Sequence, residues 1–594
     1  MKRSTTLRIA RDLFSANGMW VLIACGAILY FLIWPLVMLV VSAFRTSPYG
    51  TAGVWTLSGF ATVLSDPWTV PTLAATVFYA AASTAVCMAL GLYFATVAAR
   101  MATPLRRLIT PAMIVLVAAP RLFYSLSWGM LGNPNSGILT GTLRMLGLGQ
   151  LPPWTTAYSW QGLLLVTSLK LAGFAYILLY GPVSRVDRSL EDAAVMAGVP
   201  RVRAFFDITL TALTPALLAA GMLIFVEVLQ VFDLPAVLGM PAGIHTLPIR
   251  VNDYLLESEQ PNWPAASALS LFIIVIVAAL LLVQRAILGD RDYVMIGGKS
   301  SASGPVPIGR WRWAIDLSIV LFLAIAIVLP TVQVALGSFQ PFFGLYTHWT
   351  LDNYRTALAD EDVFRTMVVT LAIAVFGGFA AVAASFGIAH VMQRRPRSPL
   401  ARLARIGSWV PATAPGIVLS LALLWSYLNT PLVRQLYGTP WLLLFALVVG
   451  SIPIAVRAIE GIVAQVGREV EEAARICGAS QWAATLEVTA RLCAPSLLGG
   501  WFVVGLAISG TLDIPLLLQT ENSQTVATLT YALYTNGHVP RAAAIYCLYL
   551  VAALALVVAA VVIGLALSRL MRGISAGGGT RRLRLARGGA HAGG

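Results

Sequence analysis

Residues 190–198 read LEDAAVMAG, and the similar stretch VEEAARICG occupies residues 470–478, 280 positions later. The same offset relates further identical residues on both sides: Gly181/Gly461, Arg188/Arg468, Thr209/Thr489, Pro215/Pro495, Asp233/Asp513 and Pro235/Pro515. Upstream, residues 55–60 (WTLSGF) correspond to residues 349–354 (WTLDNY) at an offset of 294, which also relates Asp66/Asp360 and Thr76/Thr370. The two offsets differ by 14 residues, and the segment 130–160 is visibly longer than its counterpart 429–440. The chain is therefore an internal duplication with one insertion.

The composition places both copies in a membrane. The chain is 58% hydrophobic and only 11% charged, whereas a soluble domain carries about 25% charged residues. Its mean hydropathy is +0.81. A helix needs about 20 apolar residues to cross a bilayer. Runs of this kind predict twelve crossings, six in each half: 19–44, 73–99, 108–129, 162–180, 212–236, 266–284, 314–338, 366–392, 406–428, 441–459, 495–518 and 542–568.

The distribution of basic residues predicts the orientation. Of the 40 lysines and arginines, 31 fall on the side of the membrane that holds the N-terminus, and 7 fall on the other side. Basic loops stay in the cytoplasm, so we expect both termini and both copies of the repeated stretch on the cytoplasmic side. An even number of crossings in each half gives the halves the same orientation, related by a pseudo-two-fold axis along the membrane normal. The net charge of +15 is mostly this topological signal and calls for no nucleic-acid partner.

The expected fold is an all-α membrane protein of two fused six-helix domains in a parallel internal repeat. We expect a cytoplasmic N-terminal segment at 1–18, a first membrane domain at 19–286 and a cytoplasmic linker at 287–312. A second membrane domain at 313–569 and a basic, disordered tail at 570–594 follow. The first apolar run is too long for a signal-peptide core and is expected to remain as a helix. The five cysteines lack metal-ligand spacing, which favours reduced thiols.

The repeated stretch predicts a short helix followed by a sharp turn. Ser189 and Asp192 resemble a capping box, and Glu191 lies in the first turn, where the helix dipole favours negative charge. Gly198 permits a left-handed turn, and Pro200 discourages continuation of the helix. In the second copy Gly478 makes the turn, and Ser480 can cap the helix that follows. A single such segment can be an ordinary solvent-facing connector. Two copies in register on one face of the membrane favour a docking element for a cytoplasmic partner.

This pattern resembles the EAA loop of ATP-binding-cassette importer permeases, commonly Glu-Ala-Ala-(x)3-Gly-(x)9-Ile-x-Leu-Pro. The first copy matches it with Asp in place of Glu and Thr211 in place of Pro, and the second copy diverges at Ala490 and Arg491. The resemblance implies a type I importer fold, an ATPase dimer in the cytoplasm, an external solute-binding protein and a bacterial inner membrane. It also implies that coupling to the ATPase is carried by Glu191, Asp192, Ala193, Ala194, Gly198, Glu471, Glu472, Ala473, Ala474 and Gly478.

The chain itself offers no nucleotide chemistry and calls for no cofactor. The nearest phosphate-loop candidate, Gly298-Lys299-Ser300, has Tyr293 where the first glycine is required and does not follow a strand. We therefore expect a transport subunit whose ATP hydrolysis belongs to a separate protein.

The substrate is suggested only by resemblance. A single chain with both halves is similar to ferric-iron uptake permeases, and residues 238–244 (LGMPAGI) followed by 246–248 (TLP) look most like that group. Thiamine, phosphonate, polyamine or another small solute are the alternatives within the class. A rival class is the ion-coupled secondary transporter, which also uses repeats and intramembrane carboxylates. The duplicated loop argues against it, because an ion-driven carrier needs no ATPase docking element.

Ionisable residues inside the spans are costly and mark candidate positions on a translocation path. They are Arg121, Lys170, Glu227, Asp233 and Asp513, with Glu460 nearer the cytoplasmic interface. The Asp-x-Pro pair at 233 and 513 is expected near the outer mouth of the path, with the two aspartates facing each other. Each Asp can satisfy backbone groups where proline breaks the helix, or it can act in a gate. Glu227 has Ala507 as its counterpart and can pair with Lys170 or Arg121.

Overall fold

The computed structural model describes residues 25–46, 53–145, 156–257, 261–288, 306, 309–559 and 562. The expected N-terminal segment 1–18, the tail 570–594 and most of the linker 287–312 lie outside these residues. Apart from two isolated β-bridges, the regular secondary structure of the described chain is helical. The all-α class predicted from the sequence is confirmed.

In the part of the chain that the structure describes, ten helical segments are long and apolar enough to cross a bilayer. Three of them are Cys25–Ala43, Gly309–Ser338 and Val539–Ala559. Six of the others contain α5 (Thr69–Arg100), α9 (Trp160–Arg185), α12 (Thr211–Gln230), α19 (Gly378–Arg394), α23 (Pro440–Ala464) and α26 (Arg491–Ser509). The last, Trp263–Leu280, is the first part of α14 (Trp263–Leu288). Two further predicted spans are each broken into a pair of helices, so the total reaches twelve if each pair counts as one crossing.

Residues 108–129 and 406–428 were each predicted as one continuous span, and this is wrong because each segment is sharply bent. In the first half, α6 (Arg106–Ala118) and α7 (Arg121–Leu131) meet at an angle of 100°. In the second half, residues Pro399–Thr413 and α21 (Gly416–Leu428) meet at 116°. Each break is an Ala-Pro step, and Ala119 and Ala414 have extended backbones with ψ of 131° and 132°. A residue before proline is pushed out of the helical region, which explains both bends.

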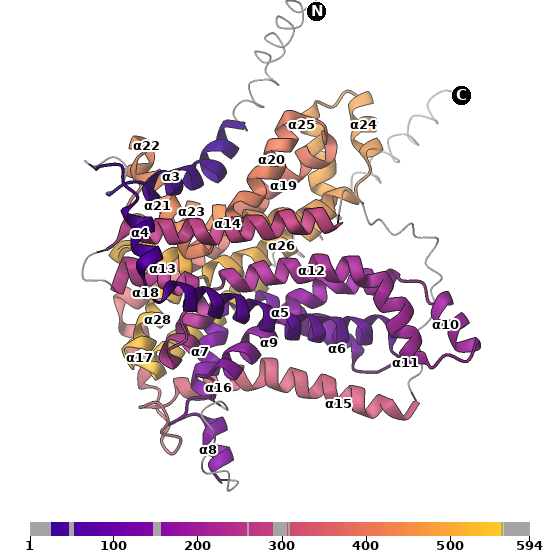
Figure 1. The fold of residues 1–594 in the computed structure, drawn as a ribbon, viewed down its shortest axis with the longest axis horizontal. Coiled ribbons are helices and arrows are strands. Elements are labelled where there is room, and N and C mark those ends of the chain that lie inside the picture. Colours follow the sequence, from indigo (N-terminus) through magenta and orange to yellow (C-terminus); the bar gives the residue numbers. More distant parts are fainter. Residues whose placement is uncertain are drawn as a thin grey trace, which may run out of the picture.

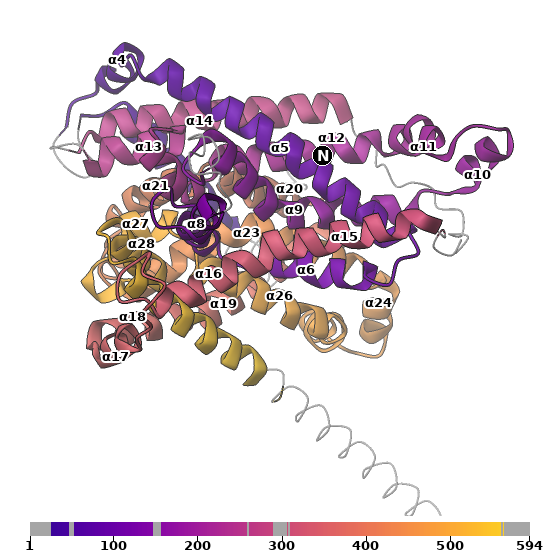
Figure 2. The ribbon, with the colours of Figure 1, turned by 90° about the horizontal axis from the view of Figure 1, so that it is seen from below.

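The two halves are interlocked through their first spans. The first span of the first half contains α3 (Trp34–Ala43), which packs against α21 of the second half. The first span of the second half ends in α16 (Leu329–Ser338), which packs against α7 of the first half. Tyr30, in the first span of the first half, donates a hydrogen bond at 2.7 Å to Oγ1 of Thr430, which follows α21. In Figures 1 and 2, α15 (Arg312–Leu323) accordingly lies beside α6 of the first half.

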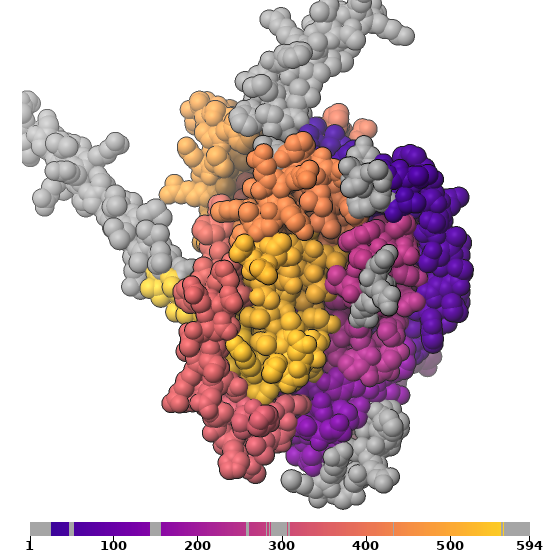
Figure 3. Space-filling view, turned by 90° about the vertical axis from the view of Figure 1, so that its left-hand side faces the viewer, coloured from indigo at the N-terminus to yellow at the C-terminus, as the bar shows by residue number. Residues whose placement is uncertain are grey.

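The duplication predicted from the sequence is visible in matching contacts at one end of the bundle. Thr76 accepts a hydrogen bond from the backbone N–H of Leu247, and Thr370 accepts one from Val526, both at 2.9 Å. These amides begin the short helices α13 (Leu247–Asn252) and α28 (Val526–Thr535). Figure 3 looks onto this end, where segments of both halves lie side by side.

Ion pairs hold the loops at the same end. Asp66 accepts hydrogen bonds from Arg250 at 2.6 Å and from Tyr254 at 2.7 Å, and Asp360 binds Arg541 at 2.6 Å. Burial alone would raise the pKa of Asp66, but the hydrogen bonds from Arg250 and Tyr254 lower it below its ordinary value. The carboxylate therefore remains charged at neutral pH, and this contact is lost only as the pH falls through the lowered pKa of Asp66.

Small residues let α19 and α26 cross closely in the second half. A Cβ atom added to Gly378 would lie 2.7 Å from the Cα of Gly505, and one added to Gly505 would lie 2.3 Å from the carbonyl oxygen of Ala374. Close backbone approach at small residues is a principal source of helix association in membranes.

We expect Gly505→Leu to destabilise the second half, because its side chain would have to force α26 away from α19. Overpacking of this kind costs about 1–3 kcal/mol, which should lower the thermal unfolding temperature of the purified protein by several degrees. Gly499→Leu on the same helix is the matched control, since no atom lies within 4 Å of a Cβ at that position. Equal unfolding temperatures for the two variants would contradict the crossing described above.

Candidate functional site

The two copies of the repeated stretch form corresponding helices at one end of the molecule. They are α10 (Ser189–Met196) and α24 (Arg468–Ile476), and they lie apart from each other at the end opposite α13 and α28 (Figures 1 and 2). The predicted glycine turns are confirmed: Gly198 has φ +89° and Gly478 has φ +95°. Ser480 caps the next helix by accepting the backbone N–H of Ala483 at 3.1 Å.

The start of α10 differs from the prediction. Arg188, not Ser189, is the N-cap residue, and it makes no side-chain capping bond. Ser189 is the first helical residue, and its backbone N–H donates to Asp187 Oδ1 at 3.0 Å. The acidic residue before the helix therefore takes the part that the sequence pattern assigned to Ser189.

Both helices present an open surface. Neither buries any residue, and the last side chain of each is almost fully exposed, 89% for Met196 and 87% for Ile476. Asp192 and Glu472, the leading acids of the EAA pattern, are exposed together with Ala193 and Ala473. Each copy thus offers an acid, small residues and an apolar tip, in the same order, to the space outside the chain.

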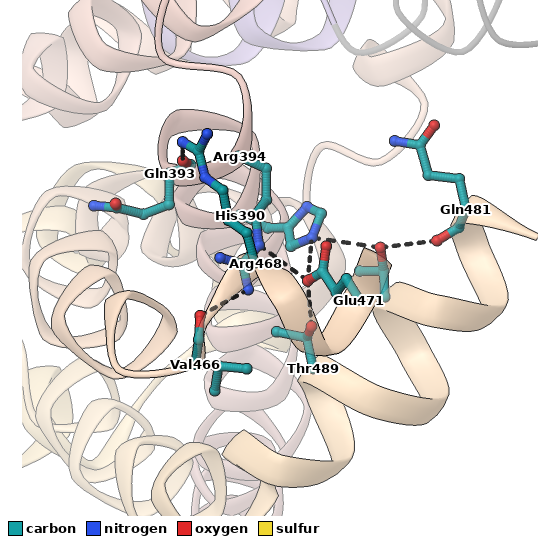
Figure 4. A network of polar contacts seen from close by, with 9 residues as sticks. His390, Gln393, Arg394, Val466, Arg468, Glu471, Gln481 and Thr489 are labelled. Atoms are coloured by element: carbon teal, nitrogen blue, oxygen red, sulfur yellow. Dashed lines mark hydrogen bonds and ion pairs between the residues drawn. The ribbon is translucent and has the colours of Figure 1, made fainter. Parts of the chain in front are cut away.

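Glu471, the acid one position before Glu472, has a largely buried side chain. Glu471 turns back toward its own bundle, where its side chain is 13% exposed (Figure 4). Its Oε1 accepts hydrogen bonds from Arg394 Nε at 3.0 Å and from Thr489. The Nε2 atom of His390 lies 3.2 Å from the same oxygen. Arg394 also donates to the carbonyl of Val466 at 3.0 Å, which ties the end of α19 to the chain that enters α24.

The first half has a corresponding arrangement, in which the threonine contacts the arginine. Arg100 contacts Glu191 at 2.5 Å, Thr209 at 3.4 Å and the carbonyl of Val186 at 3.5 Å. The Arg, Glu, Thr and carbonyl positions of the two halves correspond through the sequence offsets, 294 for the arginines and 280 for the others. We call each set a latch: Arg100, Glu191, Thr209 and Val186 in the first half, and Arg394, Glu471, Thr489 and Val466 in the second.

Two neighbouring acids on each of α10 and α24 have different roles. Glu191 and Glu471 fasten each helix to its own bundle, while Asp192 and Glu472 face outward. Sequence reasoning selected all four acids but missed Arg100 and Arg394. The offset of 294 could have identified them, because Arg100 and Arg394 are separated by 294 residues, as are Asp66 and Asp360.

Electrostatics keep the second latch closed at neutral pH. Burial would raise the pKa of Glu471, but the hydrogen bonds from Thr489 and Arg394 and the nearby charge of His390 lower it below the ordinary glutamate value. A group with a lowered pKa stabilises the folded arrangement above its ordinary pKa, and that stabilisation is lost as the pH falls through the lowered value. The latch should therefore hold throughout the pH range above about 4.3, the ordinary pKa of glutamate.

The five charged residues predicted inside the membrane come together in one cluster where the two broken spans meet. Arg121 pairs with Glu227 at 3.0 Å, which decides between the two partners considered for Glu227. Glu227, Asp233 and Asp513 are all charged neighbours of Arg121, and Asp233 is a charged neighbour of Lys170. We call this set the central cluster: Arg121, Lys170, Glu227, Asp233 and Asp513.

Part of the central cluster completes the broken helices. The last carbonyls of a helix have no intrahelical partner, and at the end of α6 the ammonium of Lys170 donates to the carbonyl of Leu116. Gln230 donates to the carbonyl of Ala412 at 2.8 Å at the other break. The carboxylate of Asp513 lies against Gly416, the first residue of α21, where negative charge is favoured. Asp233 accepts the backbone N–H of Leu512 from the opposite half.

Glu460 and Arg457 lie outside the central cluster. Glu460 accepts a hydrogen bond from Gln393 at 3.0 Å, and the guanidinium of Arg457 lies 3.1 Å from the ring centre of Trp409.

Comparison with known proteins agrees with this architecture. Residues 88–289 and 375–576 each match the family described as binding-protein-dependent transport system inner membrane component. The two matches cover more than half of the chain, and the chain belongs to this family. It is a permease subunit of an ATP-binding-cassette importer, an inner-membrane protein with two fused permease domains.

Its curated relatives are named for different solutes. A protein of Haemophilus influenzae named as a ferric transport permease, FbpB 1, is 25% identical over 350 residues, 57% of this chain and 54% of the relative. The ferric transport permease FbpB of Actinobacillus pleuropneumoniae is 24% identical over 330 residues, 53% of this chain and 46% of the relative. A protein of Salmonella typhimurium named as a 2-aminoethylphosphonate transport permease, PhnU, is 27% identical over 242 residues, 41% of this chain and 82% of the relative. The chain thus spans about half the length of the two ferric relatives.

We expect Glu471→Ala to loosen α24, because the helix loses its attachment to Arg394 and Thr489. Hydrogen exchange of the amides in 468–478 should become at least tenfold faster, which corresponds to about 1.4 kcal/mol of lost protection. Glu472→Ala is the matched control, since this neighbouring side chain is exposed. The latch would be refuted if both variants exchanged at the same rate.

Proposed function

We propose that this permease imports iron(III), driven by a homodimer of ATPase subunits in the cytoplasm and supplied by an external solute-binding protein. In this proposal the end that carries α10 and α24 faces the cytoplasm, as do both chain termini. The positive-inside distribution of lysine and arginine supports this orientation. Residues 19–286 and 313–569 are the two permease domains, and 287–312 links them.

One observation carries the coupling part of the proposal: the two helix-turn elements are presented at the same end by the same four-residue latch. Two equivalent knobs suit two equivalent grooves on an ATPase dimer. Asp192, Ala193, Ala194 and Gly198, with Glu472, Ala473, Ala474 and Gly478, would make the docking surface. Glu191 and Glu471 would transmit the motion, because each joins its docking helix to a membrane-spanning helix of the same half.

A latch of this kind gives a direct route for force. When an ATPase dimer closes, α10 and α24 are drawn together, and the latches pass this movement to α5 and α19. The central cluster, which lies between the halves, would then line the path that the movement opens. A secondary transporter has no need for such docking elements.

The substrate assignment rests on the two ferric relatives and on residues 238–248. The relative named for 2-aminoethylphosphonate supports a second candidate substrate, a small phosphonate, because 82% of its length matches this chain.

The direct test is transport by the complete importer. The permease should be reconstituted into liposomes with the ATPase and binding protein encoded beside it, and uptake of radioactive iron(III) and of 2-aminoethylphosphonate compared. We expect ATP-dependent uptake of iron(III) and none with an ATPase that cannot hydrolyse ATP. Uptake of the phosphonate alone would overturn the substrate, and uptake by the permease without an ATPase would overturn the mechanism.

We expect Gly478→Asp to uncouple ATP hydrolysis from transport while leaving membrane insertion intact. The backbone at Gly478 has φ +95°, which side chains other than glycine adopt at a cost of roughly 1–2 kcal/mol, and the added charge lies on the docking turn. ATP hydrolysis should lose its stimulation by the loaded binding protein, and uptake should fall at least tenfold. Gly461→Asp places the same charge at the end of α23, with no atom within 4 Å of its Cβ, and should transport normally.

A further inference from the structure

The Arg121–Glu227 ion pair differs from the rest of the central cluster because the broken helices do not need it. Its side chains are 30% and 26% exposed, whereas Lys170 and Asp233 are 4% and 3% exposed and make capping contacts. Arg121 is the first residue of α7, and a positive charge at a helix N-terminus is unfavourable. A partly buried ion pair that caps neither broken helix calls for a reason other than helix capping.

The pair exists in one half only. Aligning the two Ala-Pro breaks places Gly416 opposite Arg121, and the offset of 280 places Gly450 opposite Lys170 and Ala507 opposite Glu227. The space at Gly416 is filled by Asp513, whose Oδ2 would lie 1.7 Å from an added Cβ. The first half therefore projects charged side chains toward a second half that is small at the same positions.

Arg121 has more acidic neighbours than basic ones. Three carboxylates surround it, those of Glu227, Asp233 and Asp513. The second cation, Lys170, is engaged by the carbonyl of Leu116. Asp233 Oδ1 is buried and has no hydrogen-bond partner among the described residues. Charged carboxylates in a membrane interior are expensive, and a cation beside them stabilises their charged form.

We infer that Arg121 is a tethered counter-ion: its guanidinium neutralises the carboxylates of the empty path, and a hard cation in transit displaces it from Glu227 and contacts Asp233 and Asp513. The inference rests on the proposed function and extends it by naming the class of cargo and the place where the cargo meets the permease. Trivalent cations such as iron(III) prefer carboxylate oxygens. The tethered guanidinium returns to Glu227 when the cargo leaves, so the carboxylates of the empty path regain it as a counter-ion.

The arrangement suits passage and not storage. No group of three or more His, Cys, Asp or Glu side chains is placed to hold a metal ion anywhere in the described part of the chain. Conduction requires contacts that are favourable enough to admit an ion and weak enough to release it. Two carboxylates with a competing arginine satisfy both requirements.

The first test is binding of terbium(III), a hard trivalent cation whose luminescence reports carboxylate ligands, to the full chain in phosphatidylcholine nanodiscs, with empty discs as the blank. Arg121→Gln removes the competitor and should tighten terbium binding at least tenfold. Arg121→Lys keeps the charge and should bind as weakly as the wild-type chain. Asp233→Asn in the Arg121→Gln background removes one of the two carboxylates that contact the cation and should reverse the gain. Arg457→Gln, which removes an arginine outside the central cluster, should leave binding unchanged. Terbium binding to Arg121→Gln that is no tighter than to Arg457→Gln overturns the inference.

The second test separates this inference from the proposed function. In the reconstituted importer, Arg121→Gln should lower the maximal rate of iron(III) uptake at least fivefold, because release from the path becomes slow, while Arg121→Lys should retain most of it. Normal iron(III) uptake by Arg121→Gln overturns the counter-ion and leaves the proposed function intact. If the wild-type importer takes up only a phosphonate, the proposed substrate fails. A tenfold rise in the half-saturating phosphonate concentration for Arg121→Gln would then make Arg121 an anion ligand and overturn the inference as well.

Discussion

Backbone groups that lose their helical partners inside a bilayer must find others, and this constraint organises the centre of the molecule. Each half contains one Ala-Pro step in the middle of an apolar segment, and each step bends its span by 100° or more. Water is not there to satisfy the freed carbonyl and amide groups. Lys170 and Gln230 take its place at the freed carbonyls, and Asp513 sets a carboxylate beside the first residue of α21. Lys170 and Asp513 thereby bring formal charge into the membrane. Some of the charged residues predicted to line a translocation path are therefore present because the helices are broken.

The duplication has been used in two ways. At the ends of the bundle the halves remain alike: the latches, the Thr76 and Thr370 contacts and the glycine turns all occur twice. In the middle they differ, since charged or long side chains of the first half oppose Gly416, Gly450, Ala507 and Gly510 of the second. A Cβ on Gly510 would lie 2.2 Å from the ring of Pro120, so the small residues also permit the close contact between the breaks. Symmetry is kept where two identical partners would dock, and it is given up where a single solute would pass.

Much of this was predictable from the sequence. The apolar runs, the two offsets and the glycine turns follow from composition and pattern, because hydrophobic length and the need for φ > 0 are local properties. The two bent spans were missed because hydropathy is continuous through Ala119-Pro120 and Ala414-Pro415 and does not register a change of direction. The meeting of Arg121 with Glu227 was foreseen only as one of two pairings, because contacts between distant spans depend on how the helices pack. Arg100 and Arg394 looked like ordinary basic residues at the ends of spans, and only the folded chain shows which acids they hold.

The exchange of first spans between the halves has a consequence for how the protein is made. Tyr30 finds Thr430 across 400 residues of chain, and ribosomes add about 5–20 residues per second, so the partner is synthesised roughly 20–80 seconds later. During that interval the segment Cys25–Ala43 has only its own half to pack against, including α14, which Ser42 contacts through Ser267. Biogenesis therefore depends on an early helix that keeps one side free for a neighbour synthesised late.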